Sequence, residues 1–401
     1  MRLLFLAPFA PRCDGSHGGG RAIAELVLRL AERHRVGLVC LRGAAEPRAD
    51  PALLERCEMV HEVARPVAAG ALGRFGRRVR VAAALVRGTP AMVTGSTRRE
   101  FAEAVRHAAA SFQPDIIQLE YHLMGAYLPA LAGCRAPRVL RQLEPGAAAA
   151  RERASYRPGL ARFTGALERR AWTRYERSVM AQVEAVVVLT PRDAAALAPL
   201  AGATPIECIP LALTPPARAF DPAGTAAELL FVGNYTHSPN VEAVERLIHV
   251  ILPRVRAACP DAVLRVVGAH PPARWSGREA AGILVSGSVP DVGSYLDRAA
   301  VVLAPLSIGG GMRVKVMEAL AGGKAVVATP LALEGLGVED GRQVRIGRTD
   351  EELARLTIEL LQCRDRRAAL GTRARAWALA ALGWDGPLAA FERLYASLQP
   401  R

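Results

Sequence analysis

The chain has 401 residues, of which 51% are hydrophobic and 22% charged, and it has a formal net charge of +14. This is the composition of a folded globular protein, which excludes a long disordered tract, and the length suits two domains. No apolar run reaches the roughly 18 residues of a membrane span. The seven cysteines include no C-x-x-C pair, so we expect reduced thiols in a cytoplasmic protein.

Short apolar runs alternate with amphipathic stretches along the chain. Leu3–Ala7 is predicted to be a strand, followed by a Gly-rich turn and a helix over Arg21–Arg33 whose apolar residues recur on one face. Further strands are predicted at Val36–Leu41, Ile116–Leu119, Ala185–Leu189, Leu229–Val232, Ala262–Val267, Ile283–Val285, Val301–Ala304 and Ala325–Ala328. Apolar strands that alternate with helices are typical of parallel, doubly wound sheets.

The segment Ile209–Pro216 contains three prolines and is predicted to be an extended linker. We therefore expect an α/β protein with one Rossmann-like domain over residues 1–213 and a second over 214–385. Residues 386–401 are predicted to form a C-terminal helix that packs back on the first domain. Ligands of such sheets bind at the carboxyl ends of the strands, so candidate sites are sought there.

Two Gly-rich segments follow predicted strands. Gly18, Gly19 and Gly20 end a segment that also holds His17, and they precede a helix whose free N–H groups suit a phosphate or a sugar hydroxyl. Gly233 and Asn234 follow the first strand of the second half, with Asn240 as the predicted N-cap of the next helix. Each segment alone is equally compatible with an ordinary tight turn.

The strongest signal lies between Ala304 and Gly323. Three glycines, Gly309–Gly311, precede a helix that carries Arg313 and Lys315 and ends at Gly322. Cations and free N–H groups at one helix start are what a diphosphate site requires, and Lys315 is one of only two lysines in the chain. Glu318 has the chemistry to accept two ribose hydroxyls. The alternatives are a solvated face for the cations and an ion pair between Glu318 and Lys315.

Together these segments resemble the donor domain of family 4 retaining glycosyltransferases, which have the GT-B fold of two Rossmann-like parallel-sheet domains facing across a cleft. The similarity is strongest over residues 225–335 and extends to a subgroup with a Gly-Gly-Gly-x-Arg-x-Lys segment. It implies that Glu318 binds the nucleotide ribose and that the backbone of Val289 and Pro290 meets the base. It also implies that Gly310, Gly311 and Met312 hold the sugar and phosphate, and that Gly18–Gly20 complete the cleft.

The sequence departs from this family at two places. The first family glutamate falls on Gly310, and the usual Arg and Lys after the strand that ends at Gly233 are absent. We infer that Arg313 and Lys315 neutralise the diphosphate instead. No Asp-x-Asp metal motif occurs on a loop, so we expect no metal ion and no cofactor besides the nucleotide diphosphate sugar, which is the donor substrate.

In the first half, the predicted strand at Ile116–Leu119 leads to Glu120 and His122. Either side chain is a candidate for contacting the sugar or deprotonating the acceptor, and the alternative is that both, like Glu144, are ordinary loop residues. No carboxylate nucleophile is evident. A front-face route, in which the leaving phosphate acts as the base, is therefore expected to give retention.

The positive charge is concentrated in residues 1–213, which carry a net +11 against +3 for the rest of the chain. Between Val63 and Arg99 there are eight arginines and no acidic residue. Such a stretch suits either a solvated helix packed on the first domain or a basic amphipathic helix on an anionic membrane. A second Arg-rich stretch, Arg151 to Arg177, is predicted to be helical. No basic-aromatic motif indicates nucleic acid.

The sequence therefore predicts a glycosyltransferase that acts on a glycan, a lipid-linked molecule or another acceptor in surface polysaccharide or glycolipid synthesis. We expect it in the cytoplasm, with the inner face of the membrane as a peripheral site. The alternatives are a non-catalytic nucleotide- or membrane-binding protein with a degenerate cleft, and a sugar-nucleotide epimerase or phosphorylase on the same scaffold.

Overall fold

The computed structural model describes residues 1–15, 18–44, 46–65, 81, 83–155, 161–221 and 227–399. The chain divides into two compact units. The first comprises residues 1–15, 19–210 and 386–401, and the second comprises Gly18 and residues 211–385. The segment 209–216 forms neither helix nor strand, as its prolines predict.

The first unit is built on a seven-stranded sheet in the order β3-β2-β1-β4-β5-β6-β7. All of its strand pairs are parallel. Its strands are β1 (Arg2–Ala7), β2 (Arg35–Gly43), β3 (Met59–Arg65), β4 (Ile116–Glu120), β5 (Arg138–Gln142), β6 (Ala185–Val188) and β7 (Ile206–Cys208). The strands β1 and β6 are buried on both faces, which explains their apolar runs Leu3–Ala7 and Ala185–Val188; β4 is equally buried but also carries Gln118 and Glu120.

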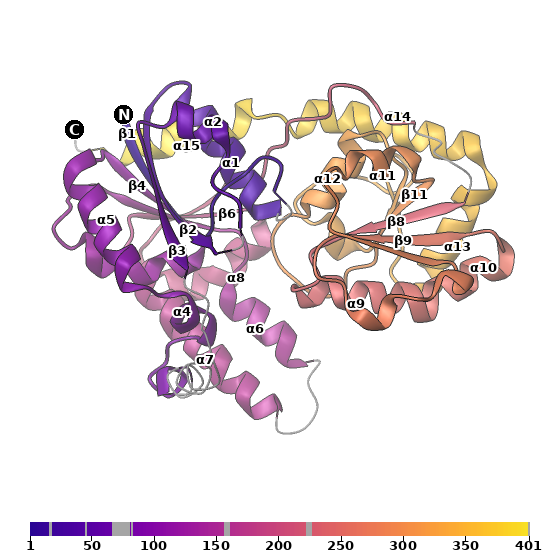
Figure 1. Ribbon diagram of the computed structural model, residues 1–401, viewed down its shortest axis with the longest axis horizontal. Helices are drawn as coiled ribbons and strands as arrows, with labels where there is room; N and C mark the ends of the chain where they lie inside the picture. The colour runs from indigo at the N-terminus through magenta and orange to yellow at the C-terminus, as the bar shows by residue number, and fades with distance from the viewer. Residues whose placement is uncertain are drawn as a thin grey trace. The chain divides into compact units, whose positions relative to one another are not determined.

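Helices cover this sheet, and α6 and α7 lie side by side (Figure 1). The core includes buried aliphatic residues of β1, β4, β5 and β6 together with Phe101 and Phe112 of α5. The helices are α1 (Gly18–Ala31), α2 (Pro51–Arg56), α4 (Ala91–Ser96), α5 (Arg99–Phe112), the 3₁₀ segment η1 (His122–Leu131), α6 (Gly146–Ser155), α7 (Ala161–Met180), α8 (Pro191–Ala201) and α15 (Asp385–Leu398).

The second unit has a six-stranded sheet in the order β10-β9-β8-β11-β12-β13. Its strands are likewise all parallel. They are β8 (Glu228–Val232), β9 (Val263–Val267), β10 (Ile283–Gly287), β11 (Val301–Ala304), β12 (Val326–Ala328) and β13 (Arg345–Ile346). In both sheets the strand order reverses once, at β1/β4 in the first and at β8/β11 in the second.

The helices of the second unit flank the sheet, with α9 and α10 on one side and α11 and α12 on the other (Figure 1). They are α9 (Ser238–Arg246), the π segment η2 (Leu247–Ile251), α10 (Leu252–Ala258), η3 (Ala273–Trp275), η4 (Glu279–Ala281), α11 (Gly293–Arg298), α12 (Val314–Ala321), η5 (Pro330–Leu333), α13 (Asp350–Gln362) and α14 (Arg364–Ala381). Every strand predicted from an apolar run is present to within one or two residues at its ends.

Candidate functional site

The switch point of the second sheet lies between β8 and β11, the neighbouring strands at which the strand order reverses. In open parallel sheets this point leaves a crevice at the carboxyl ends of the strands, where ligands bind. The chain leaves β8 after Val232 and β11 after Ala304. Two of the three predicted Gly-rich segments therefore start at this switch point.

The loop after β8 is held by asparagine side chains. Asn234 accepts hydrogen bonds at its Oδ1 from the N–H and hydroxyl of Thr236, at 3.0 and 2.8 Å. Asn240 donates from its Nδ2 to the carbonyl oxygen of Asn234 at 2.8 Å. Gly233 packs so closely on Asn240 that an added Cβ would lie 2.9 Å from the Asn240 side chain, which explains the glycine there.

The predicted capping role of Asn240 is wrong. Helix α9 begins at Ser238, and His237 occupies the N-cap position without a side-chain capping bond. Pro239 begins the helix earlier than expected because proline is well suited to the first helical turn. The side chain of Asn240 is buried and serves the loop and Lys315 instead.

Lys315 lies in the first turn of α12, and its ammonium group is held at the switch point. Its Nζ donates to Oδ1 of Asn240 at 2.6 Å and sits 4.2 Å from the ring centroid of Phe231 in β8. Burial, with a smaller contribution from the Arg313 guanidinium, lowers the pKa of Lys315 to about 7. This cation is positioned by neutral groups, so its charge is available to an anion.

Arg313 has a different position from the one expected. It occupies the N-cap of α12 and not its first turn. Its guanidinium is buried and donates to the carbonyl oxygens of Gly310 and Gly311, and to that of Gly309 at 2.9 Å. Arg313 therefore holds the Gly-rich loop in its folded shape, whereas direct contact with a diphosphate was expected of it.

The loop before α12 presents backbone amides. Gly309 and Gly311 have φ values of 113° and 70°, a conformation that favours glycine. Within the described part of the chain, the N–H groups of Gly311 and Met312 have no hydrogen-bond partner, while the Met312 sulfur accepts from the Leu211 N–H. In the segment after β11, two consecutive amides and Lys315 thus lie within a span of five residues, from Gly311 to Lys315.

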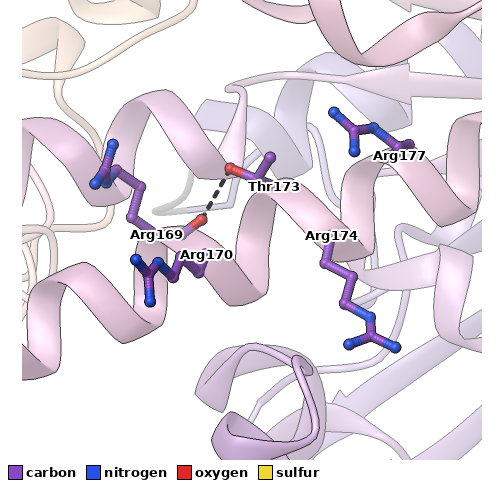
Figure 2. Close-up of a pocket in the computed structure, with 5 residues that line it drawn as sticks. All are labelled: Arg169, Arg170, Thr173, Arg174 and Arg177. Atoms are coloured by element: carbon purple, nitrogen blue, oxygen red, sulfur yellow. Dashed lines mark hydrogen bonds between the residues drawn. The ribbon is translucent and has the colours of Figure 1, made fainter.

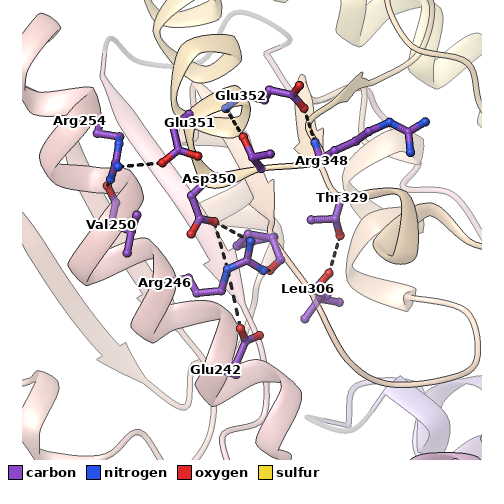
Figure 3. A network of polar contacts seen from close by, with 12 residues as sticks. Glu242, Arg246, Val250, Arg254, Leu306, Thr329, Arg348, Asp350, Glu351 and Glu352 are labelled. Atoms are coloured by element: carbon purple, nitrogen blue, oxygen red, sulfur yellow. Dashed lines mark hydrogen bonds and ion pairs between the residues drawn. The ribbon is translucent and has the colours of Figure 1, made fainter. Parts of the chain in front are cut away.

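A polar network holds the start of this loop, at Pro305 and Leu306 (Figure 3). Arg246 of α9 donates to the carbonyl oxygen of Pro305 at 2.6 Å and pairs with Asp350 of α13, also at 2.6 Å. The Thr329 hydroxyl donates to the carbonyl oxygen of Leu306, again at 2.6 Å. Since these carbonyls begin the Gly-rich loop, α9, β12 and α13 together fix where it leaves the sheet.

The other donor residues predicted in the second half of the chain lie on α12 and on the loop between β10 and α11. Glu318 is half-buried one turn further along α12. Val289 and Pro290 lie between β10 and α11, and the Asp291 carboxylate caps α11 by accepting from the N–H groups of Gly293 and Ser294 at 2.7 and 2.9 Å. Sequence reasoning missed Arg246 as a support of the loop, since its link to Asp350 spans 104 residues.

In the first unit the side chain of Glu120 is enclosed by other protein groups, and its contact with a ligand stays a prediction. Its side chain is 0% exposed and pairs with Arg141 of β5 at 3.4 Å. Gln118 donates to Glu120 at 3.3 Å and accepts from the Tyr395 hydroxyl at 3.1 Å. Burial raises the pKa of Glu120. This carboxylate belongs to a buried polar cluster beneath α15.

His122 is also enclosed, and its contact with the acceptor stays a prediction. It is 4% exposed, and its ring lies edge-on to Trp172 with the centroids 4.6 Å apart. Its Nδ1 is 3.2 Å from the carbonyl oxygen of Glu144. The preceding Tyr121 has a φ of 75°, in the left-handed range that a bulky residue rarely adopts. The chain thus turns sharply after β4, and this turn directs His122 toward Trp172 in the protein interior.

Gly18, Gly19 and Gly20 are the first three residues of α1. The helix thus begins three residues before the predicted start at Arg21, and binding by these glycines stays a prediction. Ser16 and His17 of the same motif lie outside the described residues, as do Arg74, Arg77, Arg78 and Arg80 of the predicted basic helix.

Residues 226–363 match the family model described as "Glycosyl transferases group 1". The chain has the GT-B fold. Over 99% of both chains it is similar to sucrose-phosphate synthase from Thermosynechococcus elongatus, with 15% identity and a TM-score of 0.69. WaaG, a glycosyltransferase involved in lipopolysaccharide biosynthesis, is 15% identical over all of both chains, with a TM-score of 0.67.

Anabaena HepE in complex with UDP and glucose is a third GT-B structure that resembles the chain, with 14% identity, a TM-score of 0.64, and coverage of 99% of this chain and 100% of HepE. No curated protein sequence matches the chain significantly. The family match lies within the second unit and includes both loops of its switch point, so the matched region contains the candidate site.

Two properties of the described residues bear on the expected partners. Among them, no group of three or more His, Cys, Asp or Glu side chains is arranged to hold a metal ion. None of their helices combines the length and apolar character that a membrane crossing requires. Metal independence and peripheral membrane association stay predictions.

Proposed function

We propose that this chain transfers a sugar from a nucleotide diphosphate sugar to a glycan or lipid-linked acceptor, with retention of configuration and without a metal ion. The proposed role is a step in surface polysaccharide or glycolipid synthesis, at the cytoplasmic face of the membrane. The donor is a substrate, and no further cofactor is proposed. Uridine diphosphate is the first nucleotide to test, since HepE was solved with UDP and with UDP-glucose.

The observation that carries this proposal is the position of the Lys315 ammonium. It stands between Asn240 and Phe231 at the switch point of the domain that matches the glycosyltransferase family. The amides of Gly311 and Met312 are close to it in sequence and have no internal partner among the described residues. An ammonium and free amides are suitable ligands for a diphosphate.

These groups would act on the leaving group. As the bond between the anomeric carbon and the phosphate oxygen breaks, negative charge grows on the diphosphate, and Lys315 and the amides would stabilise it. The acceptor oxygen would then bond to the same face of the anomeric carbon, and its proton would pass to the departing phosphate oxygen. This front-face route gives retention and uses no carboxylate nucleophile.

In this proposal the half-buried Glu318 would accept the ribose hydroxyls, and the backbone at Val289 and Pro290 would meet the base. Gly233 and Asn234 would border the diphosphate on the β8 side. Arg313 would act as a positioning residue because it donates to the carbonyls of the Gly-rich loop. Gly310, in place of the family's glutamate, would contribute only backbone to the sugar.

Substitution of Lys315 tests the proposal. We expect Lys315→Met to weaken UDP binding by about 10- to 100-fold in calorimetry, the value of one charge-assisted hydrogen bond. Arg348→Gln is the matched control, because it removes an exposed cation of the same unit, and it should bind UDP like the original protein. Equal UDP affinity in both variants would show that the diphosphate binds elsewhere or not at all.

The second candidate is a non-catalytic nucleotide-binding protein. Gly310 at the position of the family's first glutamate favours it, as does the burial of Glu120 and His122. Incubation of the protein with UDP-glucose and a panel of lipid-linked and glycan acceptors separates the two. Release of UDP that depends on an acceptor supports transfer, whereas tight UDP binding without release supports the second candidate.

A further inference from the structure

The outward side of α7 carries an unusual concentration of arginine. Arg169, Arg170, Arg174 and Arg177, with Thr173, line a cavity of about 590 Å³ at the surface of the first unit (Figure 2). In an α-helix these five positions fall within an arc of about 140°. The four arginines are exposed. We call them the arginine face.

The charge of this face is not compensated by the acidic residues of its own helix. Glu176 is 1% exposed and points the other way, accepting from the N–H groups of Gly146 and Ala147 at 2.7 and 3.1 Å. Glu168 accepts from the N–H of Ala91 at 3.2 Å. Within the described part of the chain, none of the four guanidinium groups forms an ion pair or a hydrogen bond. Four positive charges therefore face outward together.

Exposed apolar side chains lie beside the arginine face. Gly88 packs on Arg174, since an added Cβ there would lie 2.7 Å from its Cδ. Val86, two residues before Gly88, is 83% exposed, and Met92, next to Ala91, is 47% exposed. Val93 packs against Trp172 of α7, which fixes this segment to the helix. Cations and exposed apolar side chains thus share one region.

The geometry points to an anionic lipid bilayer as the partner of the arginine face: we propose that α7 and residues 83–92 dock the protein on phospholipid headgroups. Arg169 and Arg177 are eight residues apart, which spans about 12 Å along a helix, so the four charges are spread over more than two turns of α7. An array of lipid phosphates matches that spacing. Val86 and Met92 suit the boundary between headgroups and acyl chains. The choice of a lipid partner rests on the membrane location given under the proposed function. Binding to the bilayer itself does not require the protein to transfer a sugar.

Vesicle co-sedimentation tests this proposal. The full chain should bind phosphatidylcholine vesicles that contain 30% phosphatidylglycerol in preference to pure phosphatidylcholine. Each arginine near an anionic surface contributes about fivefold in affinity. Replacing all four arginines of the face by Gln should therefore reduce binding at least tenfold. The matched control replaces Arg106, Arg135, Arg364 and Arg366 by Gln, which removes the same charge from exposed positions elsewhere and should retain most of the binding.

Three results would overturn the proposal: equal losses in the two quadruple variants, release of the protein from vesicles by 10 mM inorganic phosphate, or tighter arginine-dependent binding to duplex DNA than to the anionic vesicles. Val86→Ser with Met92→Ser should weaken vesicle binding further at 0.5 M NaCl, where the charges are screened. UDP affinity should be unchanged in every variant. A failure of lipid docking is thus distinguishable from a failure of the donor site.

Discussion

In the first unit the polar residues at and after the end of β4 are buried, while in the second unit Lys315, on the helix after β11, is half-buried and pairs with no acidic group. Glu120 is neutralised by Arg141 and covered by α15, whereas Lys315 has only neutral neighbours at hydrogen-bond and ring-contact distance. The charge at the end of β4 is thus paired within the protein, whereas the charge on the helix after β11 has no charged partner and is available to the diphosphate in the proposed function. The difference arises because Glu120 is paired with a cation, Arg141, whereas Lys315 is paired with a neutral amide, Asn240.

Removing the buried carboxylate should have the largest effect. Glu120→Ala leaves the Arg141 guanidinium buried without its partner, so we expect the free energy of unfolding of the first unit to fall by about 3–5 kcal/mol. Tyr395→Phe, which removes one hydrogen bond from the same cluster, should cost about 1 kcal/mol. Urea denaturation measures both. Loss of transfer activity in Glu120→Ala at unchanged stability would contradict the structural role and restore Glu120 as a reacting group.

The pH dependence of donor binding should be the next largest effect. Because the pKa of Lys315 is lowered to about 7, the ammonium is charged below that pH and must take up a proton to bind a diphosphate above it. UDP-glucose affinity should therefore fall about tenfold between roughly pH 6 and pH 8.5. Calorimetry with UDP-glucose is preferred to UDP, whose terminal phosphate titrates in the same range. The Lys315→Met variant should show a flat profile, and a slope that survives this substitution would assign the titration to another group.

Loosening the support of the Gly-rich loop should have the smallest effect. Arg246→Ala removes the bond to the Pro305 carbonyl and the pair with Asp350, so we expect UDP affinity to fall by about three- to fivefold, or about 1 kcal/mol. Arg254→Ala is the matched control, since Arg254 pairs with Glu351 at the surface and contacts no part of the loop (Figure 3). Equal affinities in the two variants would show that the loop keeps its shape without Arg246.

Much of the fold could be predicted from the sequence because most of the inner strands contain apolar runs of three or more residues. The strands that were not predicted have polar residues for specific reasons. β5 carries Arg138 and Arg141, the second of which is buried against Glu120. β3 is at the edge of its sheet and carries His61 and Glu62. β7 and β13 are edge strands of three and two residues.

The sequence predicted which loops form the candidate site, but not the direction in which their side chains point. Glycines after strand ends locate the loops, because ligands of parallel sheets bind there. The direction of each side chain depends on partners far along the chain. Lys315 meets Asn240 across 75 residues, and Tyr395 meets Gln118 across 277. Contacts between residues so far apart in the chain cannot be predicted from a local sequence pattern. For this reason Arg313 was expected to contact a ligand, and Glu120 was expected to be accessible.

The assignment of α15 to the first unit has a practical consequence. The chain enters the second unit after Pro210 and returns after Asp385, so neither unit can be isolated by a single cut. A fragment ending at Pro210 would lack Phe391 and Tyr395, and it would leave Arg141 and Gln118 uncovered. Joining residues 1–210 to 386–401 through a short Gly-Ser bridge should give the smallest polypeptide that still encloses that cluster.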